Sequence, residues 1–263
     1  MFEFPIIVDI FFVSFLVACL IQFLLLFTIQ GRVMARCKKK NKEGDMPDDV
    51  KPGVSVIVYA HNQGEALRRN LPSLLDNDYP NFEVIVVDDT SCDNTQDVLT
   101  IMEQRNDNIF HTKLTDKVRT MSHRKLALLL GVKAAHNEII LTTKAQCVPV
   151  SKIWISKMAR NFTSKVDFVI GPMVFEGRLG LNSRFCQYDL FQRMVNMFGV
   201  TMSYCAFSGW SDNMAFRKHL LFEDNNKAFS GHLHIHPGED DLFINAVAKH
   251  ARVAVECCHE SMV

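Results

Sequence analysis

Two adjacent carboxylates, Asp88 and Asp89, directly follow an apolar run that is rich in β-branched residues. The run begins at Phe82, and small polar residues continue the segment to Thr95 (FEVIVVDDTSCDNT). A short unbroken apolar run predicts a strand buried on both faces, which favours a parallel sheet. Because ligands of open α/β sheets bind beyond the carboxyl ends of strands, we expect the two acids to bind a ligand. The alternative is that they only cap a following helix over Gln96–Arg105.

The segments around this run alternate between strand-like and helix-like patterns. Val54–Ala60 reads as a second buried strand, and Glu65–Leu75 has leucines spaced for one helical face, so the domain opens with a βαβ unit. The predicted fold class is therefore α/β, with a mostly parallel central sheet flanked by helices. Further expected strands lie at 109–114, 138–142, 167–173 and 252–257, further helices at 123–135, 152–162, 183–198 and 241–250, and a loop leading into a strand at 205–216.

An apolar segment near the N-terminus, Ile6–Ile29, is long enough to cross a hydrocarbon core of about 30 Å. Positive flanks stay cytoplasmic, so the sequence predicts an outside N-terminus and a single-pass protein of the inner or plasma membrane, with the domain after the span in the cytoplasm. The alternatives are a buried core helix and a cleaved signal peptide, but no Lys or Arg precedes the run. The basic residues after it are Arg32, Arg36, Lys38, Lys39, Lys40 and Lys42.

Composition and the positions of glycine and proline divide the chain into three parts. We expect a transmembrane anchor at 1–31, a charged linker at 32–53 that contains Gly44, Pro47 and Pro52, and one α/β domain at 54–263. A formal net charge of zero and a pI of about 7.1 argue against nucleic acid as a partner. The eight cysteines include no CxxC pair and read as reduced, mostly buried thiols.

Five segments resemble, in order, motifs of the inverting, membrane-associated glycosyltransferases of family 2, which have the GT-A fold. The likeness covers about Val54 to Ala251. It implies transfer of a sugar from a nucleotide-diphosphate sugar to a hydroxyl of a saccharide or lipid-linked acceptor, as in the synthesis of cell-surface polysaccharides or glycolipids. The segments are VSVIVYAHNQGEAL, EVIVVDDTSCDNT, HRKLALLLGVKAAHNEIIL, SGWSDNMAFRKHLL and GEDDLFINAVA.

The resemblance also implies roles for individual residues. Inversion requires a base that takes the proton of the acceptor hydroxyl, and the motif position gives Asp240 this role. Asp241 is the neighbouring alternative, and Glu239 lies in the same turn. The implied donor-binding residues are Ala60, Asn62, Glu65, Asp88, Asp89, Lys125, Lys144 and Gln146, with Asp89 near the base or ribose; the acceptor side is implied at Gly209, Trp210 and Asn213.

The chain departs from the family after the strand EIIL. The family carries Asp-x-Asp there, which holds Mg²⁺ or Mn²⁺ on the diphosphate, whereas this chain has Lys144-Ala145-Gln146. Divalent cations of this kind prefer carboxylate oxygens, so we expect no metal at this position. In one reading, the Lys144 ammonium meets the diphosphate directly. In a second, the protein is a catalytically silent binding or scaffold relative, and in a third, Lys144 points into solvent.

Other residues carry weaker signals. His232, His234 and His236 alternate and would share one face of a strand, as zinc ligands or as part of a loop that shapes the acceptor pocket. Trp210 is either a platform for a sugar ring or core packing. Arg217 and Lys218 are either phosphate ligands or a solvated pair.

The processive members of the family carry a Gln-x-x-Arg-Trp segment beyond the base, and this chain stops at Val263 without one. We therefore expect a C-terminally incomplete domain. The whole interpretation rests on one spatial expectation, which is that Asp89, Lys144 and Asp240 converge on one cleft at the same rim of the sheet.

Overall fold

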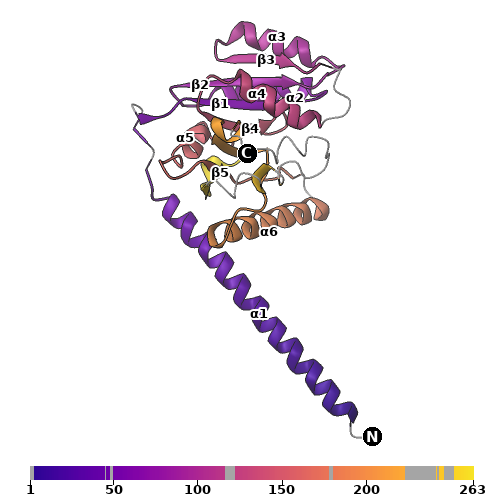
Figure 1. Ribbon diagram of the computed structural model, residues 1–263. Coiled ribbons are helices and arrows are strands. Elements are labelled where there is room, and N and C mark those ends of the chain that lie inside the picture. Colours follow the sequence, from indigo (N-terminus) through magenta and orange to yellow (C-terminus); the bar gives the residue numbers. More distant parts are fainter. Residues whose placement is uncertain are drawn as a thin grey trace.

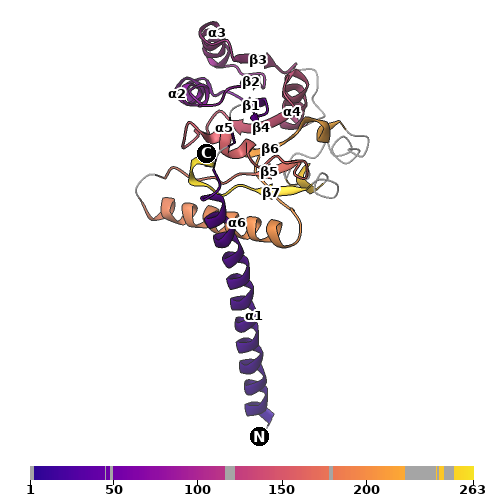
Figure 2. The same ribbon diagram turned by 90° about the vertical axis from the view of Figure 1, so that its left-hand side faces the viewer.

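The computed structural model describes residues 3–44, 46–47, 50–115, 122–177, 180–222, 241, 243–245 and 252–263. A long N-terminal helix projects from an α/β domain whose strands stack one above another (Figures 1 and 2). Four parallel strands form the first part of the sheet: β1 (Val54–Ala60), β2 (Phe82–Asp88), β3 (Ile109–Lys113) and β4 (Ile139–Lys144).

Three short strands complete a seven-stranded sheet in the order β3-β2-β1-β4-β6-β5-β7. Within it, β6 is antiparallel to both of its neighbours, while β5 and β7 are parallel to each other. The prediction of a mostly parallel sheet is thus confirmed. The added strands are β5 (Phe168–Ile170), β6 (Met214–Arg217) and β7 (Val253–Val255).

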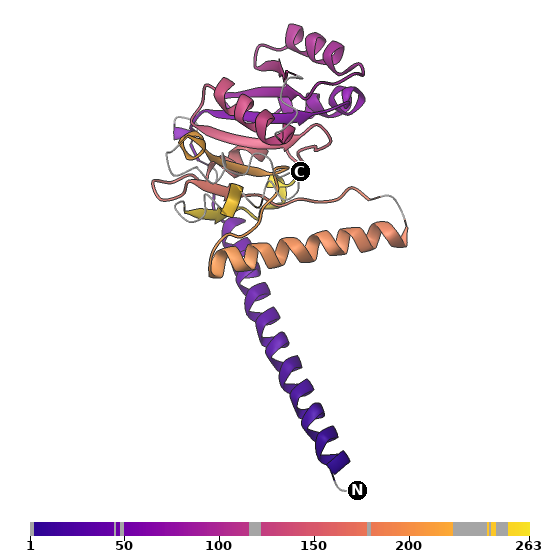
Figure 3. The same ribbon diagram turned by 45° about the vertical axis from the view of Figure 1, so that its right-hand side comes forward.

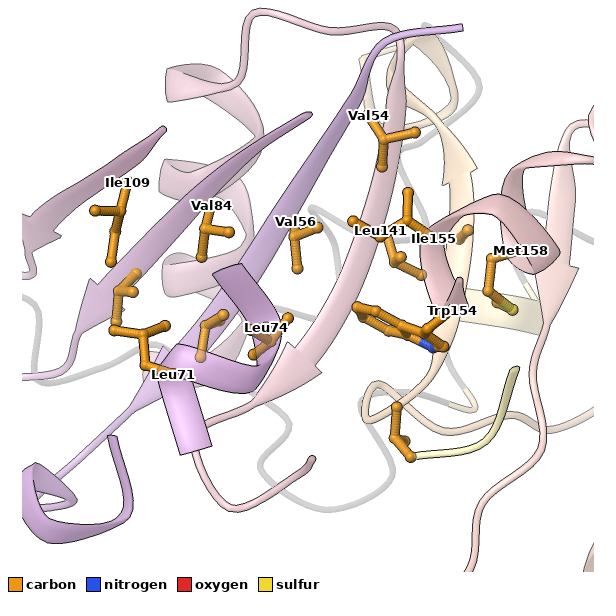
Figure 4. Packing of buried hydrophobic residues seen from close by; sticks show 14 of the residues in the cluster. Val54, Val56, Leu71, Leu74, Val84, Ile109, Leu141, Trp154, Ile155 and Met158 are labelled. Carbon is orange, nitrogen blue, oxygen red and sulfur yellow. The ribbon is translucent and has the colours of Figure 1, made fainter. Parts of the chain in front are cut away.

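Two hydrophobic layers cover the sheet. One face carries α2 (Gly64–Leu75), α3 (Thr95–Arg105) and α5 (Trp154–Ala159), whose leucines and Trp154 pack on the β-branched residues of the central strands. Figure 4 shows this layer, with Leu71 and Leu74 of α2 over Val56 and Val84. The other face carries α4 (His123–Ala134) and α6 (Leu181–Ser203). Two short 3₁₀ helices follow strands: η2 (Lys218–Leu221) comes after β6, and η4 (His259–Ser261) comes after β7. Figure 2 places α2 and α4 on opposite sides of the strands.

The N-terminal helix α1 runs from Glu3 to Lys40, so it extends through the first part of the expected linker. Between Val8 and Lys40 its most apolar window has a mean hydropathy of 2.8 and is not buried by the rest of the chain, so by length and composition α1 suits a membrane span. Its end joins the domain, because Val33 packs in the same core cluster as Met194 and Phe198 of α6.

Most predicted elements are present, with shifted ends. β4 continues to Lys144, two residues past its expected end, because Thr142, Thr143 and Lys144 still align with residues of β1. By contrast, β5 and β7 are each shorter than predicted. Of the expected helix at 241–250, residues 241 and 243–245 are described and are helical.

A buried ion pair joins the C-terminal segment after β7 to the end of α5. The guanidinium of Arg160 contacts both carboxylate oxygens of Glu256 at 3.1 Å, and the two side chains are 3% and 0% exposed. Asn161 Nδ2 and the backbone amides of Cys257 and Cys258 also donate to Glu256. Burial alone would raise the pKa of Glu256, but these donors hold it below its usual value.

Glu256→Gln should lower the free energy of unfolding by about 3–5 kcal/mol, because it leaves the Arg160 charge buried without a counter-charge. Urea denaturation in detergent measures this change. Since the pKa of Glu256 is depressed, the stabilisation is present above its unfolded value of about 4.3 and is lost as the pH falls through the folded value. Asp189→Asn, which breaks the exposed pair with Arg193, should cost less than about 1 kcal/mol. Equal losses in the two variants would contradict the prediction.

Candidate active site

The loops that follow β1 and β2 lock together at the carboxyl rim of the sheet. The backbone amide of Asn62 donates to Ser91 Oγ, and the amide of Cys92 donates to Asn62 Oδ1, each at 2.8 Å. Asn62 and Thr90 both have positive φ, at 51° and 50°, which is rare for a β-branched residue such as threonine. Such local strain persists only where the surrounding structure enforces it, and it often marks a binding site.

Asp93, rather than Asp88 or Asp89, accepts hydrogen bonds from the first residues of two helices. Its carboxylate accepts from the backbone amide of Thr95 at the start of α3 and from the amide of Gly64 at the start of α2. The alternative that Asp88 and Asp89 only cap the helix after β2 is therefore wrong, and their carboxylates are directed elsewhere.

Asp89 is the centre of a polar cluster. It is 4% exposed, and its carboxylate accepts from the Tyr59 hydroxyl at 2.6 Å and lies 2.7 Å from His123 Nδ1. His61 Nδ1 contacts the backbone carbonyl of Asp89 at 2.5 Å. Burial and the neighbouring carboxylate raise the pKa of Tyr59, which keeps the phenol protonated as a donor to Asp89.

Asp88 is even more buried, at 1% exposure. Its Oδ1 accepts from the backbone amide of Ser91, while its Oδ2 has no hydrogen-bond partner among the described residues. A buried carboxylate oxygen without a donor is costly, so a hydrogen-bond donor at this atom would be favourable.

Lys144 ends β4 directly beside Tyr59 of β1, its partner in the sheet register. Its ammonium contacts both carboxylate oxygens of Asp212, at 2.9 and 3.0 Å, and the two side chains are 24% and 15% exposed. The reading in which Lys144 points into solvent is therefore wrong. The ion pair joins the rim of β4 to the loop that leads into β6.

The residues at the Asp-x-Asp position do not fit a divalent cation. Lys144 is a cation already paired with Asp212, and Gln146 is exposed and offers a single neutral oxygen. Among the described residues, no three His, Cys, Asp or Glu side chains are grouped so that they would hold a metal ion. The alternating histidines 232, 234 and 236 lie outside the described residues.

A cavity opens between the ends of β1 and β4 and the start of α4. Its lining includes Arg124, Lys125 and Lys144, and the Arg124 guanidinium lies 5.8 Å from the centre of the Tyr59 ring. Lys125 is 2% exposed, so it is almost fully buried beside the cavity. The apolar floor is formed by Ile57, Val87, Met214 and Phe243.

Phe243 links this cavity to the expected catalytic turn. It is one of the described helical residues, 241 and 243–245, and Asp241 itself is exposed. Asp240 and Glu239 lie outside the described residues. Lys144, Phe243 and Tyr59 line the cavity, and Asp89 reaches it through the hydrogen bond from the Tyr59 hydroxyl. The convergence of Asp89, Lys144 and Asp240 on one cleft stays a prediction.

The three residues predicted on the acceptor side are all packed against other parts of the domain. Gly209 lies against Ile244, so closely that a Cβ there would overlap the isoleucine side chain. Trp210 is partly buried and packs against the core. Asn213 is 0% exposed, and its amide hydrogens go to the carbonyls of Pro172 and Ser261 while its oxygen accepts from Trp154. The side chain of Asn213 is committed to the fold, so its prediction as an acceptor contact is corrected.

Two other predicted residues support the rim. Ala60 is buried and its carbonyl accepts from the amide of Asp89. Glu65 is exposed and accepts from Asn94 at 3.3 Å, across the two locked loops. The phosphate reading for Arg217 and Lys218 is wrong, because Arg217 aligns with the first residue of β4 and so lies at the opposite rim of the sheet.

Sequence reasoning missed the partners of the predicted residues: Tyr59, His61, His123, Arg124 and Asp212. All five lie within or next to motif segments, but their contacts join elements that are far apart in the chain. For Asp212 a signal existed, since a lysine at the position of a metal ligand calls for a nearby counter-charge.

Cys147 reports on the ion pair, because its Sγ lies 3.6 Å from Asp212 Oδ1. Burial and the Asp212 carboxylate raise the pKa of the thiol to about 11. Asp212→Asn should therefore lower this pKa and speed the alkylation of Cys147 by iodoacetamide at about pH 9, followed by peptide mass spectrometry. The exposed Cys92 in the same sample is the control and should keep its rate. An unchanged rate at Cys147 would show that Asp212 does not act on this thiol.

Known proteins resemble this chain in fold and in sequence. The structure of the mannosyltransferase PcManGT from Pyrobaculum calidifontis, in complex with GDP-Man and Mn2+, aligns with 90% of this chain and 64% of its own, with a TM-score of 0.59 at 19% identity. S. aureus TarS 1-349 aligns with 77% of this chain and 57% of its own, with a TM-score of 0.56 at 22% identity. Both likenesses concern the GT-A fold.

The putative teichuronic acid biosynthesis glycosyltransferase TuaG of Bacillus subtilis (strain 168) is 35% identical over 78 residues. These residues are 30% of this chain and 31% of TuaG, so the chain covers less than two thirds of the length of the relatives named here. The family described as Glycosyl transferase family 2 matches residues 55–216, which is more than half of the chain and includes the acid pair, Lys144 and Asp212. By this match the chain belongs to glycosyl transferase family 2.

Proposed function

We propose that this chain is an inverting glycosyltransferase that uses a nucleotide-diphosphate sugar and holds the diphosphate with its own cations. The observation that carries the proposal is the cavity at the carboxyl rim, where Arg124, Lys125 and Lys144 lie beside the Asp89 cluster. Relatives of the same fold were solved with GDP-Man and with UDP-GlcNAc, which supports a donor of this class.

The donor nucleoside would lie over the locked loops, where Asp88 Oδ2 and the Asp89 cluster offer acceptors for its N–H and hydroxyl groups. The diphosphate would then lie toward Lys144. An ammonium has three N–H donors and Asp212 accepts from at most two, so Lys144 keeps a donor for a phosphate oxygen while Asp212 fixes its position.

The reaction would be a single displacement at the anomeric carbon. The acceptor oxygen forms the new bond to this carbon as its proton passes to the Asp240 carboxylate, and the bond to the diphosphate breaks with its electron pair on the leaving oxygen. The cations of the cavity would stabilise the charge that develops on that oxygen. The acceptor would enter beside Gly209 and Trp210, and a hydroxyl on a saccharide or lipid-linked saccharide suits an enzyme anchored through α1 with its domain in the cytoplasm.

The second candidate is a silent binding or scaffold protein with the same fold. The Lys144–Asp212 contact favours it, because an ammonium that is already paired offers less charge to a diphosphate than a free one. Donor binding separates the two candidates. A chain that binds no UDP- or GDP-sugar in calorimetry would support the scaffold.

Lys144→Met should weaken the affinity for the donor sugar about tenfold to a hundredfold, because it removes a charge-assisted hydrogen bond and keeps the length of the side chain. EDTA should leave the affinity of the unsubstituted chain unchanged. Titration calorimetry with UDP-GlcNAc, UDP-glucose and GDP-mannose measures both effects. Lys165→Met, which removes an exposed charge before β5, is the matched control. Strict dependence of binding or turnover on a divalent metal would refute the role of Lys144.

Asp240→Asn should lower kcat by about 10²- to 10⁴-fold, because the acceptor hydroxyl loses its base. Donor affinity should stay within about twofold, since the carboxylate acts on the acceptor side. Asp241→Asn is the control for the neighbouring carboxylate and should change kcat little. If Asp241→Asn shows the large loss instead, the base is one residue later than proposed.

A further inference from the structure

An exposed apolar stripe runs along the N-terminal half of α6. Leu181, Phe185, Tyr188 and Phe191 follow each other at intervals of four, three and three residues, so they share one face of the helix. They are 83%, 70%, 64% and 55% exposed. Large apolar side chains gathered on one exposed face mark an interaction surface rather than ordinary scatter.

The same face of α6 meets α1 farther along the helix. Gly199 lies against Ile29 of α1, so closely that a Cβ there would overlap the isoleucine side chain. Gly199 and Leu181 are 18 residues apart, which is five helical turns, so they lie on one side of α6. The stripe is thus the free continuation of the face that holds α1.

Helices α1 and α6 meet at Ile29, where the residues of α1 change from apolar to basic. Ile29 is the last residue of the apolar span, and Arg32 is the first of the basic residues beyond it. Figure 3 shows α6 lying crosswise to α1 at the base of the domain, with its N-terminal end extending beyond the sheet. If α1 spans a bilayer, α6 therefore lies at the level of the lipid headgroups.

An apolar groove between the two helices continues the stripe. Phe191 belongs to both, and Met194 and Phe198 of α6 line the groove opposite Val33 and Met34 of α1. Lys38 lies at the same groove. A continuous apolar surface next to basic side chains matches the chemistry of a leaflet that contains anionic lipids.

We propose that α6 is a second membrane contact, whose stripe of Leu181, Phe185, Tyr188 and Phe191 enters the headgroup region of an anionic leaflet. The inference rests on the proposed membrane anchoring of α1. Aromatic side chains such as Phe185 and Tyr188 suit this interface, because one part of the layer is apolar and the other is hydrated. The contact would fix the orientation of the domain, and it would bring the loop after α6, which leads to Trp210, close to a membrane-borne acceptor.

The test uses the full chain in vesicles of phosphatidylcholine and phosphatidylglycerol with brominated acyl chains, which quench nearby tryptophans. Phe185→Trp reports on the stripe, and Phe110→Trp is the matched control, since Phe110 is 44% exposed on β3 at the other edge of the sheet. The unsubstituted chain supplies the background from Trp154 and Trp210. The tryptophan introduced at position 185 should be quenched several-fold more than the one at position 110.

Flotation with the vesicles after carbonate washing is measured on the same samples. A chain that floats but shows equal, weak quenching at both positions overturns the contact of α6 and leaves the anchor standing. A chain that is released by carbonate overturns the anchor and this inference with it. Weak quenching together with a cross-linked dimer through position 185 overturns the inference too, because a second copy then covers the stripe. Equal melting temperatures in detergent exclude misfolding of either variant.

Discussion

The parallel alignment of β2, β1 and β4 is the constraint on which the site depends. Parallel neighbours end at the same rim, so Asp88 at the end of β2 and Lys144 at the end of β4 lie on either side of the last residues of β1. Because β6 runs the other way, the loop before it reaches the same rim and brings Asp212 to Lys144. One arrangement of strands therefore gathers Asp88, Lys144 and Asp212, although Asp88 and Asp212 are 124 positions apart in the chain.

The proposed role of Lys144 in place of a metal ion is consistent in charge. Two aspartates with a divalent cation sum to zero, and Lys144 with Gln146 and Asp212 also sums to zero. In the proposed mechanism, the positive charge at this position would belong to a side chain rather than to a metal ion. A fixed ammonium needs no cation from solution, although it shares its hydrogen bonds with Asp212 and so offers fewer of them to a phosphate than a metal with open positions would.

The sequence predicted the fold well, because the fold follows from local patterns. Apolar runs such as Val54–Ala60 specify buried strands, and acids after such a run specify the rim. The sequence did not predict which side chains form hydrogen bonds with each other. The bonds from Tyr59 and His123 to Asp89 cross 30 and 34 residues and leave no periodic signal. Asn213 shows the opposite error, since a polar residue in a glycine-rich motif suggested ligand binding, whereas three buried partners hold it in the fold.

The packing of α6 against the core determines which surface of the domain would face the proposed membrane. Its C-terminal half packs in the core through Met194, Met197 and Phe198, so the helix cannot turn its stripe inward without emptying that core. The stripe must therefore face water, lipid or another chain, and exposure to water is the least favourable of the three at about 25 cal/mol per Å² of apolar surface. Since α1 keeps a bilayer adjacent to this face if it spans one, lipid is the partner that is always within reach, whereas a second chain would have to be recruited. The anchor and the stripe would then act as two points of attachment, and two points restrict the tilt of the cleft where one leaves the domain free to turn.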